Sequence, residues 1–544
     1  MSDRKYIFLL LLILIIGFLL RVTMINWGLP SENLALSTYN PDEQNSYHTL
    51  EKWNPKQLKF PAGQVLHWGN LHLFVLAASL GIGKITGYVH TGNRDFYINN
   101  LKQADRLYIT GRLISVIFGT ASIIIVYLIG NLLLKNKISG ILLSVILAFL
   151  PVHIINSIYV RPDIMMMFFC LLVIYFSLKI IEDDKKIYYI LNGIFLGFAI
   201  ATKYSAGSYI LLPVLVHFIR YNSKIKYLLI LYTVSLLSFI VGCPYIFDIV
   251  SFKAAIKHLI SLSSGIWYSE FGHIPGWWRY FTWYLPSGIG ILLLLTSICG
   301  FILMIFNYRE KNNLLILIAG VIVFIFTAHS RFQAVWHTLP VIPFIVIYAG
   351  YFLYFLYTQK NYILKISGRI LVVFILCYTS IYSFANVNLF IQENTRKQAS
   401  DWIIKNISEK SKIAIAKSFF WTPPVLRQYN PPYKVLMGVD PVKYGVDEGV
   451  IGLKDIIKQT DYIVLTEYEY RSYIHPELKK FFPEQSKIIE EIFYGRKFKK
   501  IIEFDKQAEF LGIKFKKKYP PLDWLIPNPK IIIFKKNQEI CLKN

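Results

Sequence analysis

Long apolar runs separated by short polar connections fill the first 390 residues of the chain. Many of these runs approach the roughly 20 apolar residues that cross a bilayer as a helix. The first run lacks a small-residue cleavage site, so it predicts a retained signal-anchor. The pattern predicts an α-helical polytopic membrane protein, with runs at about residues 6–26, 68–86, 113–134, 138–158, 164–181, 188–201, 205–219, 227–247, 283–306, 313–328, 338–357 and 370–389.

Basic residues in the connections predict how these runs thread the membrane, because Lys and Arg collect in short cytoplasmic loops. Six basic groups fall on one side if every run spans except 68–86. We therefore expect eleven spans in a plasma membrane, with residues 71–85 forming an interfacial or re-entrant segment. The groups are Arg4 and Lys5, Lys135 and Lys137, Lys185 and Lys186, Arg220 with Lys224 and Lys226, Arg309 and Lys311, and Lys360 with Lys365 and Arg369.

The character of the chain changes after about residue 390. Residues 391–544 alternate helix-like and strand-like patterns, which predicts a water-soluble α/β domain beside the membrane module 1–390. An amphipathic helix is expected at 396–406 and short buried strands at 412–416, 462–465 and 531–534. Eleven spans from a cytoplasmic N-terminus would place this domain on the extracytoplasmic side.

Composition agrees with membrane residence, since 55% of the residues are hydrophobic. The net charge of +25 would suggest nucleic acid as a partner for a soluble protein. Here many of the cations flank apolar runs and no nucleic-acid motif is present, so membrane lipid is the expected partner. The five cysteines show neither metal-ligand nor disulfide spacing.

Two adjacent carboxylates, Asp42 and Glu43, follow the first apolar run and would lie outside. Asp42 is suitably placed to cap a short helix that begins near Glu43. A carboxylate at the membrane surface can also act as a general base. The pair could instead help to hold a divalent cation through its oxygens. The residues alone leave these three roles open.

Further charged residues fall on the same predicted face: Arg112 and Asp163 near the starts of spans, Lys203 between two runs, and Arg331 and His337 before another span. Each has an ordinary explanation, namely a helix start for Asp163, snorkelling for the cations and interfacial hydrogen bonding for His337. Together they suit a lipid phosphate, because cations neutralise phosphate at a lipid–water boundary. No HExxH or CxxC motif indicates a metal cluster.

Short motifs in a consistent order give the chain a family resemblance over about residues 5–390. It resembles the C-type (GT-C) membrane glycosyltransferases, specifically the family 39-like superfamily of protein O-mannosyltransferases and aminoarabinose transferases. The inserted external domain of the mannosyltransferases has no counterpart here. The motifs are Asp42-Glu43, Gly69-Asn70-Leu71, Arg112-Leu113-Ile114-Ser115, Tyr159-Val160-Arg161-Pro162-Asp163, Ala201-Thr202-Lys203-Tyr204, Pro244-Tyr245-Ile246-Phe247-Asp248, Arg331-Phe332 and Leu339-Pro340-Val341-Ile342-Pro343.

The resemblance implies an inverting glycosyltransferase that uses a polyprenyl-phosphate-linked sugar as its donor. The sugar would pass to a cell-envelope acceptor, which could be a lipid, a glycan or a protein, at the external membrane face. Asp42 would be the catalytic base and Glu43 its partner. Arg112, Lys203 and Arg331 would bind the donor phosphate.

The resemblance also implies that Asp163 and His337 bind the acceptor or a cation. A divalent cation is the one cofactor left open. The main rival is a transporter or flippase for lipid-linked saccharides, which would place charged residues near the membrane midplane and show a repeat. The charges here lie mostly at the ends of spans and no repeat is visible, so the enzyme is favoured.

Overall fold

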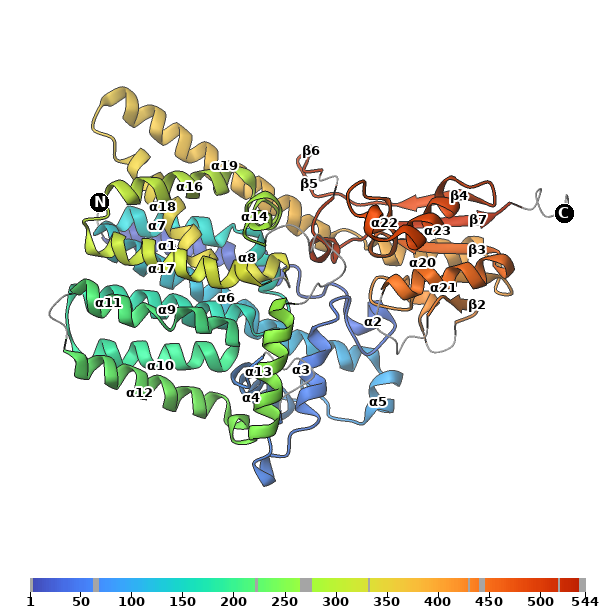
Figure 1. Ribbon diagram of the computed structural model, residues 1–544, viewed down its shortest axis with the longest axis horizontal. Coiled ribbons are helices and arrows are strands. Elements are labelled where there is room, and N and C mark those ends of the chain that lie inside the picture. The colour runs from blue at the N-terminus through green and yellow to red at the C-terminus, as the bar shows by residue number, and fades with distance from the viewer. Residues whose placement is uncertain are drawn as a thin grey trace.

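The computed structural model describes residues 3–61, 68–220, 224–264, 276–330, 333–428, 431–439, 446–516 and 519–537. A bundle of helices occupies one side of the molecule and a smaller part with a β-sheet occupies the other (Figure 1). The N-terminus lies at the end of the bundle away from the sheet. The chain therefore has the two-part architecture that its sequence predicts.

The helices of the bundle follow the predicted apolar runs and add short helices between them. They are α1 Asp3–Val22, α2 Pro30–Asn33, α3 Glu43–Leu50, α4 Leu71–Ile85, α5 Arg94–Asn99, α6 Leu101–Leu134, α7 Lys137–Ala148, α8 Pro151–Asn156, α9 Asp163–Glu182, α10 Lys186–Thr202, α11 Leu212–Arg220, α12 Ile225–Gly242, α13 Ile249–Ser264, α14 Gly276–Arg279, α15 Leu285–Ile289, α16 Ile291–Phe306, α17 Lys311–His329, α18 Ile342–Tyr357 and α19 Tyr362–Ile391.

Six helical stretches in the described residues are long and apolar enough to cross a membrane: α1, α6, α9, α12, α17 and the stretch that contains α19. The pair Gly276–Ile289 and Ile291–Phe306, bent by 119°, adds a seventh if it forms one span. The described residues thus give fewer full-length spans than the eleven predicted, because predicted runs such as 138–158, 188–201 and 338–357 form the shorter apolar helices α7, α10 and α18. Helix α4 has 15 residues, too few for a straight crossing of a ~30 Å core, in keeping with the predicted interfacial segment.

Small residues allow the helices of the bundle to approach one another closely. Helices α10 and α12 meet at Gly193 and Gly197 of α10. A Cβ atom at these positions would lie 2.4 Å from the Leu231 carbonyl oxygen and 2.3 Å from that of Ser235. Glycine therefore sets the spacing of this pair, as small residues commonly do between membrane helices.

A five-stranded sheet forms the centre of the C-terminal part, in the order β2-β1-β3-β7-β4. Strands β2, β1 and β3 are parallel, whereas β7 pairs antiparallel with β3 and β4. The predicted helix and three predicted strands correspond to α20, β1, β3 and β7. The elements are α20 Thr395–Asn406, β1 Lys412–Ile415, β2 Lys434–Met437, α21 Val446–Ile456, β3 Tyr462–Thr466, α22 Glu467–Ile474, α23 Pro483–Tyr494, β4 Phe498–Phe504, β5 Glu509–Phe510, β6 Ile513–Lys514 and β7 Ile531–Lys536.

The C-terminal part packs tightly on the bundle and on the segment that follows α1. The buried Arg396 of α20 places its guanidinium carbon 4.5 Å from the centre of the Tyr39 ring. The same side chain donates to the Ile526 carbonyl oxygen at 2.9 Å. The indole of Trp283 donates to the Tyr519 carbonyl oxygen at 2.7 Å. The boundary at residue 390 stays an interpretation, but the contacts of Arg396 with Tyr39 and of Trp283 with Tyr519 hold the two parts against each other.

Candidate active site

Asp42 stands directly before α3, where the sequence suggests a capping residue. The helix begins at Glu43 as expected, yet the Asp42 side chain makes no capping hydrogen bond. Its backbone N–H donates to Asn40 Oδ1 at 3.0 Å, and its carboxylate lies 3.5 Å from Arg161 Nη1. About a third of the Asp42 side chain, 33%, remains exposed. The Asp42 carboxylate thus lies beside the buried guanidinium of Arg161 and is partly open to solvent.

Glu43 turns the opposite way and is fully buried. Its Oε1 accepts from Arg112 Nε at 2.9 Å and its Oε2 from Arg112 Nη2 at 2.7 Å. The Val160 N–H also donates to Oε1 at 3.0 Å, and the Thr38 hydroxyl donates to Oε2. The carboxylates of Asp42 and Glu43 therefore have separate surroundings. The buried hydrogen bonds of Glu43 fix the start of α3 against α6.

Arg112 is equally buried, within α6. Besides its two bonds to Glu43, its Nη1 donates to the carbonyl oxygens of Ile25 and Trp27, both at 2.7 Å. The side chain therefore joins α6, α3 and the segment after α1. The phosphate contact predicted for Arg112 stays a prediction, and this geometry favours a structural role.

Arg161 connects the two other carboxylates of the site. Its Nη2 lies 3.1 Å from Asp163 Oδ2, and its Nη1 is the group that faces Asp42. The guanidinium carbon lies 4.4 Å from the centre of the Trp336 ring, a cation–π contact. Arg161 Nη1 is a buried donor without a hydrogen-bond partner in the described part of the chain. Such a donor is unusual and suits an incoming negatively charged oxygen.

Asp163 and Lys203 form the far end of this line of charges. Lys203, just after α10, donates from Nζ to Asp163 Oδ1 at 2.7 Å, and both side chains are buried. Asp163 is the first residue of α9, as the sequence predicts. Asp42, Arg161, Asp163 and Lys203 thus alternate in sign along one continuous set of contacts.

A close backbone approach holds Lys203 in place. The Gly69 N–H donates to the Thr202 carbonyl oxygen at 3.1 Å, and a Cβ atom on Gly69 would lie 1.9 Å from the Ala201 carbonyl oxygen. Only glycine fits there, which gives a physical reason for Gly69-Asn70 in this motif. Trp68 pairs with Lys203 as an isolated antiparallel bridge.

The remaining predicted residues are His337 and Arg331. His337 lies on the short turn Val335–Thr338, is half-buried and interacts electrostatically with Asp163. Arg331 lies outside the described residues. The structure thus brings Asp42, Asp163, Lys203 and His337 together around Arg161. Arg161 belongs to a motif that the sequence shows, but its role in connecting the other residues could not be predicted.

Asp523 is a residue near the site that no sequence pattern singled out. It comes from the C-terminal part, on the short turn Leu522–Leu525, and its Oδ2 accepts from the Val335 N–H at 2.6 Å. The next residue, Trp336, is the one that stacks on Arg161. Burial raises the pKa of Asp523 to about 7, and its hydrogen bond to Val335 works against that rise. The C-terminal part therefore supports the site through this carboxyl group.

Burial also shifts the pKa values of Asp42 and Lys203, the two groups at the ends of this line of charges. It raises the pKa of Asp42, although the charge of Arg161 opposes this rise. It lowers the pKa of Lys203, although Asp163 opposes that change. A carboxylate with a raised pKa is a better proton acceptor, so these surroundings suit Asp42 to act as a base.

The donor set fits a metal ion poorly. No group of three or more His, Cys, Asp or Glu side chains comes together within the residues that the structure describes. Arg161 and Lys203 occupy the two oxygens of Asp163, where a cation would otherwise bind. Asp163 therefore offers no free oxygen to a divalent cation.

Comparisons with known proteins agree with this architecture. The family model for dolichyl-phosphate-mannose-protein mannosyltransferase matches residues 76–263, about a third of the chain. No curated protein sequence matches. The archaeal oligosaccharyltransferase AglB from Archaeoglobus fulgidus, in complex with an inhibitory peptide and a dolichol-phosphate, is similar with a TM-score of 0.54 and 12% identity, over 97% of this chain and 77% of that one.

Two further solved structures are similar in the same way. The Archaeoglobus fulgidus oligosaccharyltransferase in complex with Zn and sulfate has a TM-score of 0.50 and 12% identity, over 88% of this chain and 70% of that one. ArnT from Cupriavidus metallidurans bound to undecaprenyl phosphate has a TM-score of 0.48 and 12% identity, over 87% and 95%.

The similarity to the oligosaccharyltransferase identifies the fold. The chain is a polytopic membrane protein with the fold of the C-type membrane glycosyltransferases and a C-terminal part that contains a β-sheet. This confirms the fold class that the sequence predicts.

Proposed function

We propose that the chain is an inverting glycosyltransferase that transfers a sugar from a polyprenyl-phosphate donor to a cell-envelope acceptor. The similar solved structures include one with dolichol-phosphate and one with undecaprenyl phosphate, and the matching family model describes a mannosyltransferase that uses a dolichyl-phosphate sugar. The observation that carries the proposal is the buried line of charges from Asp42 to Lys203, of which Asp42 is the member open to solvent.

The site belongs to the extracytoplasmic face in this proposal. The N-terminus lies at the end of the bundle opposite the C-terminal part, as does the point where α11 ends and α12 begins (Figure 1). Arg220 is the last residue of α11 and Lys224 directly precedes α12, so both lie at that end of the bundle. Basic residues prefer the cytoplasmic side, which supports an external position for Asp42 and the C-terminal part.

Asp42 acts as the base in a single displacement. It takes the proton from the acceptor hydroxyl or amine while the acceptor oxygen or nitrogen forms a bond to the anomeric carbon. The bond from that carbon to the phosphate oxygen breaks on the opposite face, and its electron pair leaves with the polyprenyl phosphate. One attack from the opposite face inverts the anomeric configuration.

Cationic groups stabilise the departing phosphate. Arg161 Nη1 has no hydrogen-bond partner in the described residues and lies 3.5 Å from Asp42, so it can donate to a phosphate oxygen next to the base. Lys203 adds a second positive charge on the far side of Asp163. Arg331 keeps its predicted phosphate contact within this proposal. A well-aimed donor of this kind contributes about 3 kcal/mol to transition-state stabilisation.

The acceptor approaches from the side of Asp42, with His337 and Asp163 nearby. Asp163 holds Arg161 and Lys203 by its two oxygens, so its contribution is to keep both cations in position. Glu43 binds Arg112 with both carboxylate oxygens and so holds the start of α3, and with it Asp42, in position.

Transfer can be measured with membranes that contain the chain and a radiolabelled polyprenyl-phosphate sugar. We expect label to leave the lipid donor and to appear in an envelope product whose anomeric configuration is the inverse of the donor's. Membranes without the chain are the control. Retention of configuration, or transport of intact donor without transfer, would contradict the proposal.

A further inference from the structure

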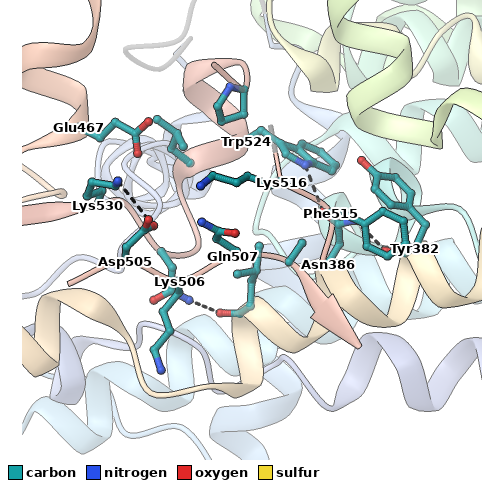
Figure 2. A pocket seen from close by; sticks show the side chains of 15 residues that line it. Tyr382, Asn386, Glu467, Asp505, Lys506, Gln507, Phe515, Lys516, Trp524 and Lys530 are labelled. Atoms are coloured by element: carbon teal, nitrogen blue, oxygen red, sulfur yellow. Dashed lines mark hydrogen bonds and ion pairs between the residues drawn. The ribbon is translucent and has the colours of Figure 1, made fainter. Parts of the chain in front are cut away.

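A cavity of about 310 Å³ lies between the bundle and the C-terminal part (Figure 2). Its walls come from α19, the segments on either side of the hairpin β5–β6, and the stretch before β7. The charged residues of the candidate active site do not line it. Its volume stands at the lower end of the ~300–1,000 Å³ typical of ligand sites, which suits one small ligand unit.

One wall of the cavity is aromatic and rigid. The indole of Trp524 donates to Asn386 Oδ1 at 3.1 Å, and the Tyr382 hydroxyl donates to the Ser287 carbonyl oxygen at 2.7 Å. Phe515 packs edge-on against Tyr382, with ring centres 5.0 Å apart. These contacts fix the rings before any ligand arrives, which lowers the entropy lost on binding.

The opposite wall is polar and carries charges of both signs. Lys530 lies 3.1 Å from Asp505 Oδ2, so this pair is largely neutralised. Figure 2 shows Gln507 and Lys516 reaching into the cavity, with Glu467 at its edge. No hydrogen bond or ion pair engages the side chains of Gln507 and Lys516 within the described residues. The wall therefore offers both donors and acceptors to a ligand.

A ligand that fits must be amphipathic, with an apolar face and a rim of hydroxyl groups. A pyranose ring has this character: its C–H face packs on aromatic rings, and each hydroxyl both donates and accepts. We propose that this cavity binds a saccharide unit, with its ring face on Trp524 and its hydroxyls on Gln507, Lys516 and Glu467. That this saccharide belongs to the acceptor rests on the proposed glycosyl transfer.

The position of the cavity agrees with a role in acceptor recognition. Asp523 and Trp524 are adjacent, yet Asp523 binds Val335 beside the active site and Trp524 binds Asn386 at the cavity. A single stretch of chain thus separates the two sites.

Binding can be measured without any donor, by saturation-transfer NMR on the full-length chain in phosphatidylcholine nanodiscs. The probes are methyl α-mannoside, methyl β-glucoside and methyl β-glucuronide, with glycerol phosphate as the comparison that lacks a sugar ring. We expect ring protons of at least one glycoside to receive saturation. Gln507→Ala and Lys516→Ala should each weaken that binding about fivefold, the effect of one lost hydrogen bond.

Lys514→Ala is the matched control, because Lys514 lies two residues away and pairs with Glu509 on the surface at 3.6 Å. It should bind glycosides like the unchanged protein. Equal binding in a Gln507→Ala/Lys516→Ala double variant would overturn the proposal, as would binding of glycerol phosphate in place of every glycoside.

The same variants separate this proposal from the proposed function. Asp42→Asn should still bind the glycoside while transfer is lost. Normal transfer by Asp42→Asn together with lost binding in the double variant would refute the catalytic role of Asp42 and leave the saccharide site standing.

Discussion

Arg161 Nη1 lies 3.5 Å from Asp42 Oδ2, and this contact links the exposed carboxylate of the site to a buried network of charge. The same guanidinium binds Asp163 and stacks on Trp336. Asp42 is therefore oriented by a fixed cation and keeps one side open. Both carboxylate oxygens of its neighbour Glu43 accept hydrogen bonds from Arg112, so the supporting role predicted for Glu43 stays a prediction.

Replacing Asp42 by Asn should reduce sugar transfer by about 10²–10⁴-fold, because the amide cannot take a proton from the acceptor. The protein should fold and express normally, since Asp42 is partly exposed and makes no capping bond. Initial rates with a labelled polyprenyl-phosphate sugar measure this. Asp95→Asn, which changes an exposed carboxylate on α5, is the control and should be fully active. Near-normal transfer by Asp42→Asn would exclude it as the base.

The rate of transfer should fall as the pH decreases through the pKa of Asp42. Burial raises that pKa above the usual value of about 3.9, so the loss should begin at a higher pH than for an ordinary aspartate. Arg161 lowers it, so Arg161→Gln should move the acid limb of kcat/KM to still higher pH. A pH–rate profile of both proteins tests this. An acid limb that stays in place in Arg161→Gln would contradict the pairing.

Glu43→Gln should destabilise the protein by about 3–5 kcal/mol, because it leaves the buried charge of Arg112 without its partner. Thermal unfolding in detergent measures the loss. The double variant Glu43→Leu/Arg112→Met should be more stable than either single variant, since it removes both buried charges. Wild-type stability of Arg112→Lys combined with weaker donor binding would instead restore the phosphate role predicted for Arg112.

Lys203→Ala should weaken use of the donor about 10–100-fold, the worth of a charge-assisted hydrogen bond to phosphate. The effect should fall on the donor KM, with Lys203→Arg keeping part of the activity. Lys253→Ala, an exposed lysine on α13, is the matched control. An unchanged donor KM in folded Lys203→Ala would assign this lysine to structure alone.

Asp523 should make the protein less stable as the pH rises. Burial raises its pKa to about 7, against about 3.9 in an unfolded chain. The folded state thus binds the proton more tightly, and this contribution is complete below about pH 4 and lost as the pH rises through about 7. Between about pH 5 and about pH 8, the melting temperature should fall more for the unchanged protein than for Asp523→Asn.

Asparagine can still accept the Val335 N–H, so Asp523→Asn keeps the support of Trp336. Glu467 and Glu469, whose pKa values burial also raises to about 7, titrate in both proteins and cancel in the comparison. Identical pH dependence of the two proteins would contradict the assignment to Asp523.

The sequence predicted the helices better than the contacts between them. The apolar run at 113–134 is the second part of α6, which begins at Leu101. The sequence missed this start because residues 101–112 are polar enough to look like a loop, although they continue the same helix. Strands β2 and β4 were missed as well, since they are partly exposed and lack a continuous apolar run.

The amino-acid sequence by itself determined the membrane class, the C-terminal α/β pattern and the start of helices at Glu43 and Asp163. These are local properties, set by the length of an apolar run or by residues at a helix start. Only the tertiary structure decided which charges meet. Arg112 pairs with Glu43, Arg161 lies between Asp42 and Asp163, and Asp523 enters from the C-terminal part. Ion pairs depend on distances between separate elements, and packing sets those distances.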